Sequence, residues 1–295
     1  MRPFRFGVNL TGLDSRDGWL DKSRMVEELG YDVLAFSDHI GGQAPFAGLA
    51  AAAAVTHRVK LAAAVLNSAL WNPVLLTREV MTAGRLTGGR FELGLGAGYV
   101  RAEFESAGTP WGTPGSRVRR LEETVAEVSR LLDHPREMGD PSPPPRPPLM
   151  IGANGDRALR LAARQADIVS FAAARLKPGA THGTLQLLDA DEVTERVAFF
   201  EKAAAERGAA VERHILAQTV QVTDDRAGAI AALRRRMPHL SAEQVAAIPT
   251  VLIGTPRQIA DQLRQRRETF GISYVCVQEH AARDFASVVN LLSGT

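Results

Sequence analysis

Cysteine is almost absent from this sequence of 295 residues: Cys276 is the only one, so no intrachain disulfide can form. Because Cys276 lies in an apolar run from 272 to 277, we expect it to be a small buried hydrophobic residue. Lysine is also scarce, and arginine accounts for 31 of the 35 basic residues. Acidic and basic residues are interspersed, with a net charge of +2 and no basic arm or stripe, which argues against a nucleic-acid partner.

Long apolar runs are absent as well. The first ten residues, MRPFRFGVNL, lack the apolar region of a secretory signal peptide. The alanine-rich stretch 46–55 is too short to span a bilayer, and His57 and Arg58 follow it. With 45% hydrophobic residues, the chain can nevertheless bury a large core. We therefore expect a soluble, cytoplasmic protein with no membrane partner.

A complete dinucleotide-binding fingerprint is missing, although Gly94-Leu95-Gly96-Ala97-Gly98-Tyr99 comes close to one. The fingerprint requires glycine at the sixth position, where this chain has Tyr99, and a helix that starts at once. The prolines and glycines between 110 and 115 break a helix instead. What remains is a strand that ends in glycines, where a ligand can approach the backbone closely because no Cβ is in the way.

Short apolar runs alternate with helical patterns along the whole chain. The predicted strands are 4–10, 32–37, 59–66, 91–95, 149–153, 167–172, 214–222 and 272–278. Each of the first seven is followed by a predicted helix, and strands that are apolar throughout are typical of a parallel sheet covered on both faces. The pattern predicts an α/β fold, a (β/α)8 TIM barrel, rather than a doubly wound sheet. We expect one domain over 1–295, with a proline-rich loop at 140–148 and an irregular segment at 173–188 as insertions.

The catalytic end of such a barrel is formed by the residues that follow the carboxyl ends of its strands. The polar and glycine residues predicted there are Asn9, Ser37, Asp38, His39, Asn67, Gly96–Gly98, Gly152–Gly155, Glu279 and His280, with Gln218 in the middle of the seventh strand. This set contains no metal-ligand cluster, nucleophile elbow or Cys/His pair, so we expect no metal. A polar, amide-rich set suits an organic cofactor that carries the chemistry itself.

Each of these features also has a structural interpretation. Asp38 can cap the loop after its strand, and a lone histidine such as His39 is more often structural than catalytic. The segment 152–155 can be an ordinary turn, although free amides before a helix also form an anion site. Trp71 and Trp111 can pack in the core or form a wall beside a flat ring.

Five motifs give the chain a resemblance to the bacterial luciferase-like superfamily, and within it to the oxidoreductases that use the deazaflavin coenzyme F420. They are FSDHI at 36–40, LTGGRFELGLGAGYVRAEF at 86–104, RVRRLEE at 117–123, MIGANGDRALRLAARQADIVSF at 150–171, and IGTPRQIADQLRQRRETFGISYVCV at 253–277. Their order and spacing cover nearly the whole chain. The resemblance implies a (β/α)8 barrel with the cofactor ring at the carboxyl ends of the strands.

The resemblance also implies roles for single residues. His39 matches the catalytic histidine of F420-dependent sugar-phosphate dehydrogenases, and Ala64-Val65 matches a bulge with a non-prolyl cis peptide behind the ring. The implied cofactor-binding residues are Asp38, Ala64, Val65, Asn67, Gly96, Ala97 and Gly98 around the ring, and Gly152, Ala153 and Asn154 at the phosphate. Two departures argue against a sugar-phosphate substrate: Tyr99 stands where those dehydrogenases have glutamate, and Trp-Asn-Pro at 71–73 replaces the usual Arg-His-Pro.

The resemblance thus implies an oxidoreductase that transfers hydride between F420 and a small-molecule substrate, and we also expect a homodimer. His39 is the candidate proton donor or acceptor, because a histidine's ordinary pKa is about 6.5. Asp38 would hold polar groups of the ring or orient His39, and Tyr99, the other candidate catalytic residue, would shape the substrate pocket. Two alternatives stay open: an FMN-dependent monooxygenase, and a barrel that binds flavin or deazaflavin without catalysis.

Overall fold

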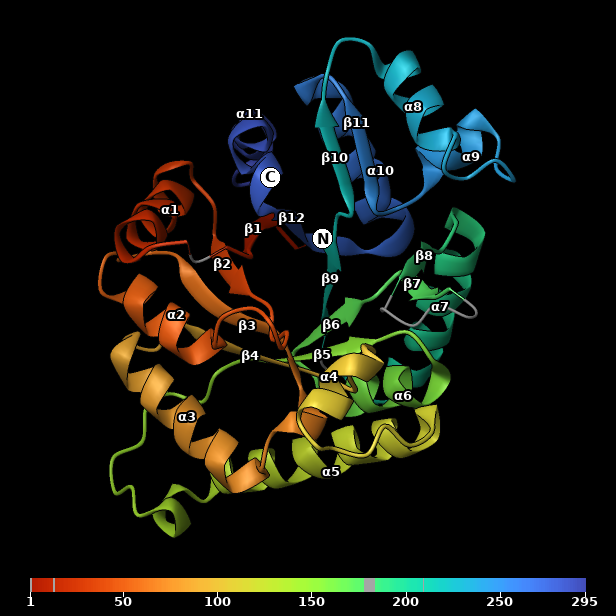
Figure 1. Ribbon diagram of the computed structural model, residues 1–295. Coiled ribbons are helices and arrows are strands. Elements are labelled where there is room, and N and C mark those ends of the chain that lie inside the picture. The colour runs from red at the N-terminus through yellow and green to blue at the C-terminus, as the bar shows by residue number, and fades with distance from the viewer. Residues whose placement is uncertain (1, 13, 178–183, 209) are drawn as a thin grey trace.

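Eight parallel strands close into a barrel in the computed structural model, which describes residues 2–12, 14–177, 184–208 and 210–295 (Figure 1). In their order around the barrel, the strands are β1 (Arg5–Leu10), β12 (Ile272–Gln278), β9 (Glu212–Leu216), β6 (Ile168–Phe171), β5 (Leu149–Ala153), β4 (Phe91–Gly96), β3 (Lys60–Asn67) and β2 (Val33–Phe36). The predicted (β/α)8 barrel is confirmed.

Helices surround the barrel, and several of them begin at recognisable capping signals. They are α1 (Arg16–Glu28), α2 (Pro45–Ala53), α3 (Pro73–Leu86), α4 (Arg101–Ser106), α5 (Pro114–Asp133), α6 (Asp156–Gln165), α7 (Ala190–Ala204), α10 (Pro256–Phe270) and α11 (Ala282–Leu292), with short 3-10 turns η1 (Ser68–Leu70), η2 (Pro135–Met138) and η3 (Glu279–Ala281). Thr113 and Thr255 form capping boxes at the starts of α5 and α10. In the described part of the chain, no helix combines the length and apolarity needed to cross a membrane.

Side chains alternate between the two faces of each barrel strand. In β1, Phe6, Val8 and Leu10 belong to the apolar core shared with the helices. Arg5 and Asn9 on the other face contact residues of other strands inside the barrel. This alternation buries both faces of the sheet, as the continuous apolar runs of the sequence require.

The barrel interior is filled only from its amino-terminal end to its middle. At the amino-terminal end, Arg5 pairs with the buried carboxylates of Glu92 at 2.5 Å and Glu212 at 2.6 Å. An apolar layer follows, formed by Val33, Ala35, Ala62, Met150, Ile168, Tyr274 and Cys276. The next inward-facing residues toward the carboxyl ends, including Val65, Gly152 and Ser170, are partly exposed. The barrel is therefore accessible to a ligand at the end where TIM-barrel chemistry takes place.

Gly94 on β4 is required by the close approach of β3. A Cβ on Gly94 would lie 2.5 Å from the Ala63 carbonyl oxygen and 3.0 Å from Val65 Cγ1. We expect Gly94→Ala to destabilise the protein by roughly 1–3 kcal/mol, because backbone atoms must move to relieve the overlap. Thermal unfolding measures this loss of stability. Gly115→Ala is the control, because Gly115 lies in the first turn of α5 and a Cβ there would have an ordinary contact with Thr113 Oγ1 at 3.8 Å. Equal melting temperatures for the two variants would contradict the prediction.

The predicted strand 214–222 is wrong, because the chain leaves the barrel partway along it. β9 ends at Leu216, and β10 (Thr219–Val222) pairs in parallel with β11 (Val251–Gly254), a strand that the sequence analysis missed. The change of partner occurs between them: Ala217 N donates to Cys276 O at 2.8 Å, whereas Gln218 N donates to Thr250 O at 2.8 Å. Gln218 therefore lies between two strands and not in the middle of one.

β10 and β11 belong to a small lobe that also contains α8 (Arg226–Arg234) and α9 (Ala242–Ala247). Figure 1 shows this lobe at the upper right, away from the barrel strands and beside α10. Its core consists of Ala229, Ile230, Val245, Ile248, Val251 and Ile253. Arg266 of α10 is buried and donates to the Ile248 and Val251 carbonyls, which ties the lobe to the helix shell of the barrel.

The two predicted insertions differ in structure. The segment 173–188, for which no period was found, contains a short antiparallel pair, β7 (Ala174–Leu176) and β8 (Leu185–Leu187), while 178–183 lies outside the described residues. Three residues per strand are too few to show a period of two. The proline-rich loop 140–148 connects η2 to β5 and packs beside α3, where Pro144 contacts Gly84.

Candidate functional site

An imidazole and a buried carboxylate meet at the carboxyl end of the barrel. His39 follows β2, and Glu103 lies on α4 after β4; His39 Nδ1 is 2.6 Å from Glu103 Oε1. The Glu103 side chain is 9% exposed, whereas that of His39 is 45% exposed. Because a carboxylate accepts hydrogen bonds, it favours a proton on Nδ1 and leaves Nε2 toward solvent. The sequence analysis missed Glu103, although its position four residues after Tyr99 was a usable signal.

Tyr99 lies against the same imidazole. The rings of Tyr99 and His39 meet edge to face with their centroids 5.8 Å apart. Burial, together with the Glu103 carboxylate, raises the pKa of the Tyr99 phenol above its ordinary value, so the phenol stays protonated at neutral pH. The two candidate catalytic residues named from the sequence are thus neighbours.

Asp38 does not orient His39, contrary to one expectation. Its Oδ2 accepts hydrogen bonds from the Asn67 backbone amide at 3.2 Å and from the Trp71 indole at 2.8 Å. Asp38 thereby joins the loop after β2 to the end of β3, and Trp71 also packs edge to face against Phe46. The carboxylate beside His39 is that of Glu103 on α4, and the Asp38 carboxylate makes other hydrogen bonds.

The bulge predicted on β3 is present. The Ala64-Val65 peptide is cis, as predicted, and the pairing of β3 with β4 shifts register between Ala63 and Leu66. The Val65 side chain lies where a Cβ on Gly96 of β4 would be, since that atom would be 2.8 Å from Val65 Cγ2, and a Cβ on Gly152 of β5 would be in van der Waals contact with Val65 at 3.4 Å. These glycines therefore let Val65 project into the accessible end of the barrel.

Gly98 and Asn67 fix the loop after β4. Gly98 has a φ of +72°, and a Cβ there would lie 2.4 Å from Asn67 Oδ1, so only glycine fits. Asn67 Oδ1 also accepts from Ala69 N at 3.2 Å, whereas Asn67 Nδ2 is buried without a partner in the described structure. Ala97, between the two glycines, is partly buried and packs on the core. The structure thus brings the residues named on β3 and β4 together.

The segment 152–154 leads directly into α6. Gly155 is the N-cap, and no side chain accepts a hydrogen bond from the amides of the first turn. Ala153 is buried, and Asn154 donates from Nδ2 to the Ala174 carbonyl at 3.3 Å. Free amides at a helix N-terminus are suited to an anion, so the phosphate role of 152–154 stays a prediction that this geometry accommodates.

Arg117 is a second feature that the sequence analysis missed. It lies in the first turn of α5, where a cation opposes the helix dipole, and no carboxylate within the described residues forms an ion pair with it. Its guanidinium stacks on Trp111 at 3.6 Å from the ring centroid, and burial lowers the pKa of Arg117. The first turns of α5 and α6 meet, since Arg157 donates to the Gly115 carbonyl at 3.4 Å. Arg117 is therefore on the same side as the free amides of α6.

The remaining predicted residues connect β1, β2 and β12. Asn9 donates to Gln278 at 3.1 Å and accepts from the Ser37 hydroxyl at 3.0 Å. Glu279 accepts from the amides of Thr11 and Gly12 and pairs with Lys22 at 2.6 Å. Burial alone would raise the pKa of Glu279, but these partners hold it below the ordinary value. Glu279 fixes a loop, and His280 is exposed.

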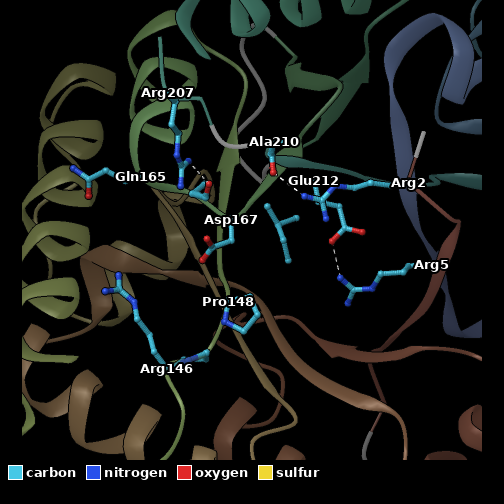
Figure 2. A pocket seen from close by; sticks show the side chains of 12 residues that line it. Arg2, Arg5, Arg146, Pro148, Gln165, Asp167, Arg207, Ala210 and Glu212 are labelled. Atoms are coloured by element: carbon cyan, nitrogen blue, oxygen red, sulfur yellow. Dashed lines mark hydrogen bonds and ion pairs between the residues drawn. The ribbon is translucent and has the colours of Figure 1, made fainter. Parts of the chain in front are cut away.

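A cavity of about 740 Å³ lies at the opposite, amino-terminal end of the barrel (Figure 2). Its cations already have partners: Figure 2 shows that Arg5 pairs with Glu212 and that Arg2 donates to the Ala210 carbonyl, and Arg146 pairs with Asp133. Arg207 likewise donates to a backbone carbonyl, that of Ala166. Because these groups are engaged and the strands of TIM barrels present their chemistry at the other end, we place the candidate site around His39.

Comparisons with known proteins address the family and the fold. A family model described as luciferase-like monooxygenase matches residues 5–273. Among solved structures, an F420-dependent secondary alcohol dehydrogenase in complex with an F420-acetone adduct superimposes with a TM-score of 0.75, at 16% identity, over 99% of this chain and 98% of that chain. At this identity the structural similarity shows the fold.

Two curated relatives illustrate the cofactors found among similar proteins. An F420-dependent glucose-6-phosphate dehydrogenase of Intrasporangium calvum is 33% identical over 171 residues, which cover 50% of this chain and 51% of that protein. An FMNH(2)-dependent dimethylsulfone monooxygenase of Pseudomonas fluorescens is 26% identical over 185 residues, covering 55% and 50%. The chain thus spans about half the length of the curated relatives it matches.

Proposed function

We propose that this chain, which belongs to the luciferase-like monooxygenase family, is an oxidoreductase that transfers a hydride between coenzyme F420 and a small organic substrate. The observation that carries the proposal is the exposed imidazole of His39, held at 2.6 Å by the buried carboxylate of Glu103 at the accessible end of the barrel. Such a pair can exchange a proton with a substrate while the cofactor exchanges the hydride.

The residues at this end fit a flat ring with a phosphate-bearing tail. Val65 offers an apolar surface to a ring, and the glycines around it keep that surface free of other side chains. The buried Asn67 Nδ2 is a donor without a partner in the described structure. The free amides in the first turn of α6 and the guanidinium of Arg117 offer positive charge to a phosphate.

Bound F420 would supply the hydride chemistry, since a deazaflavin transfers hydride and not single electrons. The protein's own residues perform the remaining tasks. Glu103 accepts a hydrogen bond from the Nδ1–H group of His39, so that Nε2 exchanges the proton that accompanies the hydride. Tyr99 covers one edge of the imidazole and, with its phenol protonated, donates a hydrogen bond to a polar group of the substrate.

We expect the protein to bind F420 at least roughly tenfold more tightly than FMN, a difference of about 1.4 kcal/mol. The support is that the F420-dependent relative is 33% identical to this chain over the matched residues and the FMN-dependent one 26%. Fluorescence quenching during titration with each cofactor measures the two Kd values. Micromolar binding of FMN without detectable binding of F420 would overturn the assignment.

An FMN-dependent monooxygenase is the second candidate. It is supported by the FMN-dependent relative. Oxygen consumption with reduced FMN and a panel of small substrates distinguishes the two, because hydride transfer by F420 consumes no oxygen. A barrel that binds either cofactor without turnover would show a Kd but neither reaction.

We also propose that residues 1–295 act as one domain and that the protein forms a homodimer. Adjacent apolar side chains on α3 support the homodimer: Val74 is 47% exposed and Leu75 is 49% exposed. Light scattering coupled to size-exclusion chromatography gives the mass in solution, and the mass of a single chain at micromolar concentration would exclude the dimer.

A further inference from the structure

A serine and a histidine form a pair inside the barrel, away from His39. Ser170 on β6 and His214 on β9 are direct partners in the parallel pairing of these strands. Their side chains share a hydrogen bond of 2.8 Å between Ser170 Oγ and His214 Nδ1. Because both strands are paired on each side in the closed barrel, the position of the serine hydroxyl is fixed by backbone pairing and by this hydrogen bond.

His214 is enclosed by the protein. It is 4% exposed, and the Tyr274 ring meets it edge to face at 4.5 Å between centroids. Its second nitrogen, Nε2, is buried and has no partner among the described residues. Burial, together with the nearby Arg5 cation, lowers the pKa of His214 to about 3. The ring is therefore neutral at physiological pH and carries one N–H group.

The location of that single proton on His214 decides whether the Ser170 hydroxyl can donate a hydrogen bond to a ligand. A buried donor without an acceptor is rarer in proteins than a buried acceptor without a donor. Nε2 is therefore the unprotonated nitrogen, and Nδ1–H donates to Ser170 Oγ. The hydroxyl proton of Ser170 then remains available, since His214 is the hydrogen-bond partner that the structure gives this hydroxyl.

Ser170 lies at the open end of the barrel interior. Ile168, the residue below it on the same face of β6, is 2% exposed, whereas Ser170 is partly exposed. Its pairing partner on β5 is Gly152, which has no side chain to cover it. A Cβ on Gly152 would contact Val65 at 3.4 Å, so the serine hydroxyl and the Val65 surface border the same space.

We propose that Ser170, oriented by His214, donates a hydrogen bond to a carbonyl oxygen of the ring that binds over Val65. This inference rests on the proposed function, because it assumes a deazaflavin ring at that place. Ser170 is then a cofactor-binding residue, and His214 is a positioning residue that acts through it.

The test measures the Kd of F420 by fluorescence quenching for the whole protein and for four variants. We expect Ser170→Ala to weaken binding by about three- to tenfold, the range of one neutral hydrogen bond. His214→Leu, which removes the donor to Ser170, should weaken binding in the same direction. His214→Asn, whose amide can donate from nearly the position of Nδ1, should restore most of the affinity. Ser273→Ala is the control, because Ser273 is a buried strand serine whose Oγ has no partner in the described structure.

The outcomes separate this inference from the proposed function. If the unaltered protein does not bind F420, the proposed function fails. If it binds F420 and Ser170→Ala binds equally well, the ring contact of Ser170 is wrong. If Ser170→Ala weakens binding but His214→Leu does not, the positioning role of His214 is wrong. The melting temperatures of all four variants show whether any of them fails to fold. If His214→Asn melts like the unaltered protein but binds F420 as weakly as His214→Leu, the positioning role of His214 is also wrong.

Discussion

Replacing His39 with alanine should lower kcat by roughly 10²–10⁴-fold, the usual contribution of a general acid or base. The Kd of F420 should change far less, because the glycines of β4 and β5 and the amides in the first turn of α6 carry most of the binding in this mechanism. The melting temperature should fall modestly: the His39 side chain is 45% exposed, but its loss leaves the Glu103 carboxylate, which is 9% exposed, without its hydrogen-bond partner. Single-turnover hydride transfer, Kd and melting temperature, measured on one preparation, test all three expectations.

His57→Ala is the matched control for this substitution. His57 is also exposed, but it precedes β3 and therefore lies at the amino-terminal end of the barrel. The His57→Ala variant should retain normal turnover. If His39 were only a packing residue, His39→Ala would leave turnover per folded molecule intact, and its whole effect would be a stability lowered by roughly 1–3 kcal/mol. That result would remove His39 from the mechanism.

The sequence was sufficient to predict the barrel because its strands carry a strong local signal. Runs such as Leu149–Ala153 are short, apolar and bounded by turn residues, and the helices between them begin at caps such as Thr255. The small lobe escaped prediction for a physical reason. β10 and β11 are also apolar, and nothing local shows that Ala217 bonds to β12 while Gln218 bonds to the residue before β11. A change of pairing partner is a tertiary property.

The candidate site was predictable in part. Residues at strand ends, such as His39 and Gly98, follow from the barrel topology alone. Their partners do not, because each comes from a distant element: Glu103 reaches His39 across 64 residues, and Asp38 bonds to Trp71 across 33. The sequence analysis gave orientation of the adjacent His39 as one of two roles for Asp38. Adjacent side chains after a strand point in different directions, and here they serve different hydrogen bonds.

Replacing Glu103 with glutamine tests the partner that the structure assigns to His39. The variant keeps the size of the side chain, but its amide can present an N–H group to Nδ1 and so favour the opposite tautomer. In a protease triad the equivalent change costs ~10⁴-fold in kcat. Because His39 is half-exposed and water competes for its nitrogens, we expect a smaller loss, roughly 10²-fold. The Kd of F420 should stay close to that of the unaltered protein.

Two measurements distinguish this role from a purely structural one. The pH dependence of kcat should change in Glu103→Gln, because it reports the group that exchanges the proton. Glu105→Gln is the control, since Glu105 lies on the same helix but pairs with Arg101 in solvent, and an exposed pair of this kind contributes little. Because Glu103 is 7% exposed, melting temperatures must accompany the kinetics. If Glu103→Gln folds normally and turns over like Glu105→Gln, the carboxylate is only a structural neighbour, and His39 acts without an orienting partner.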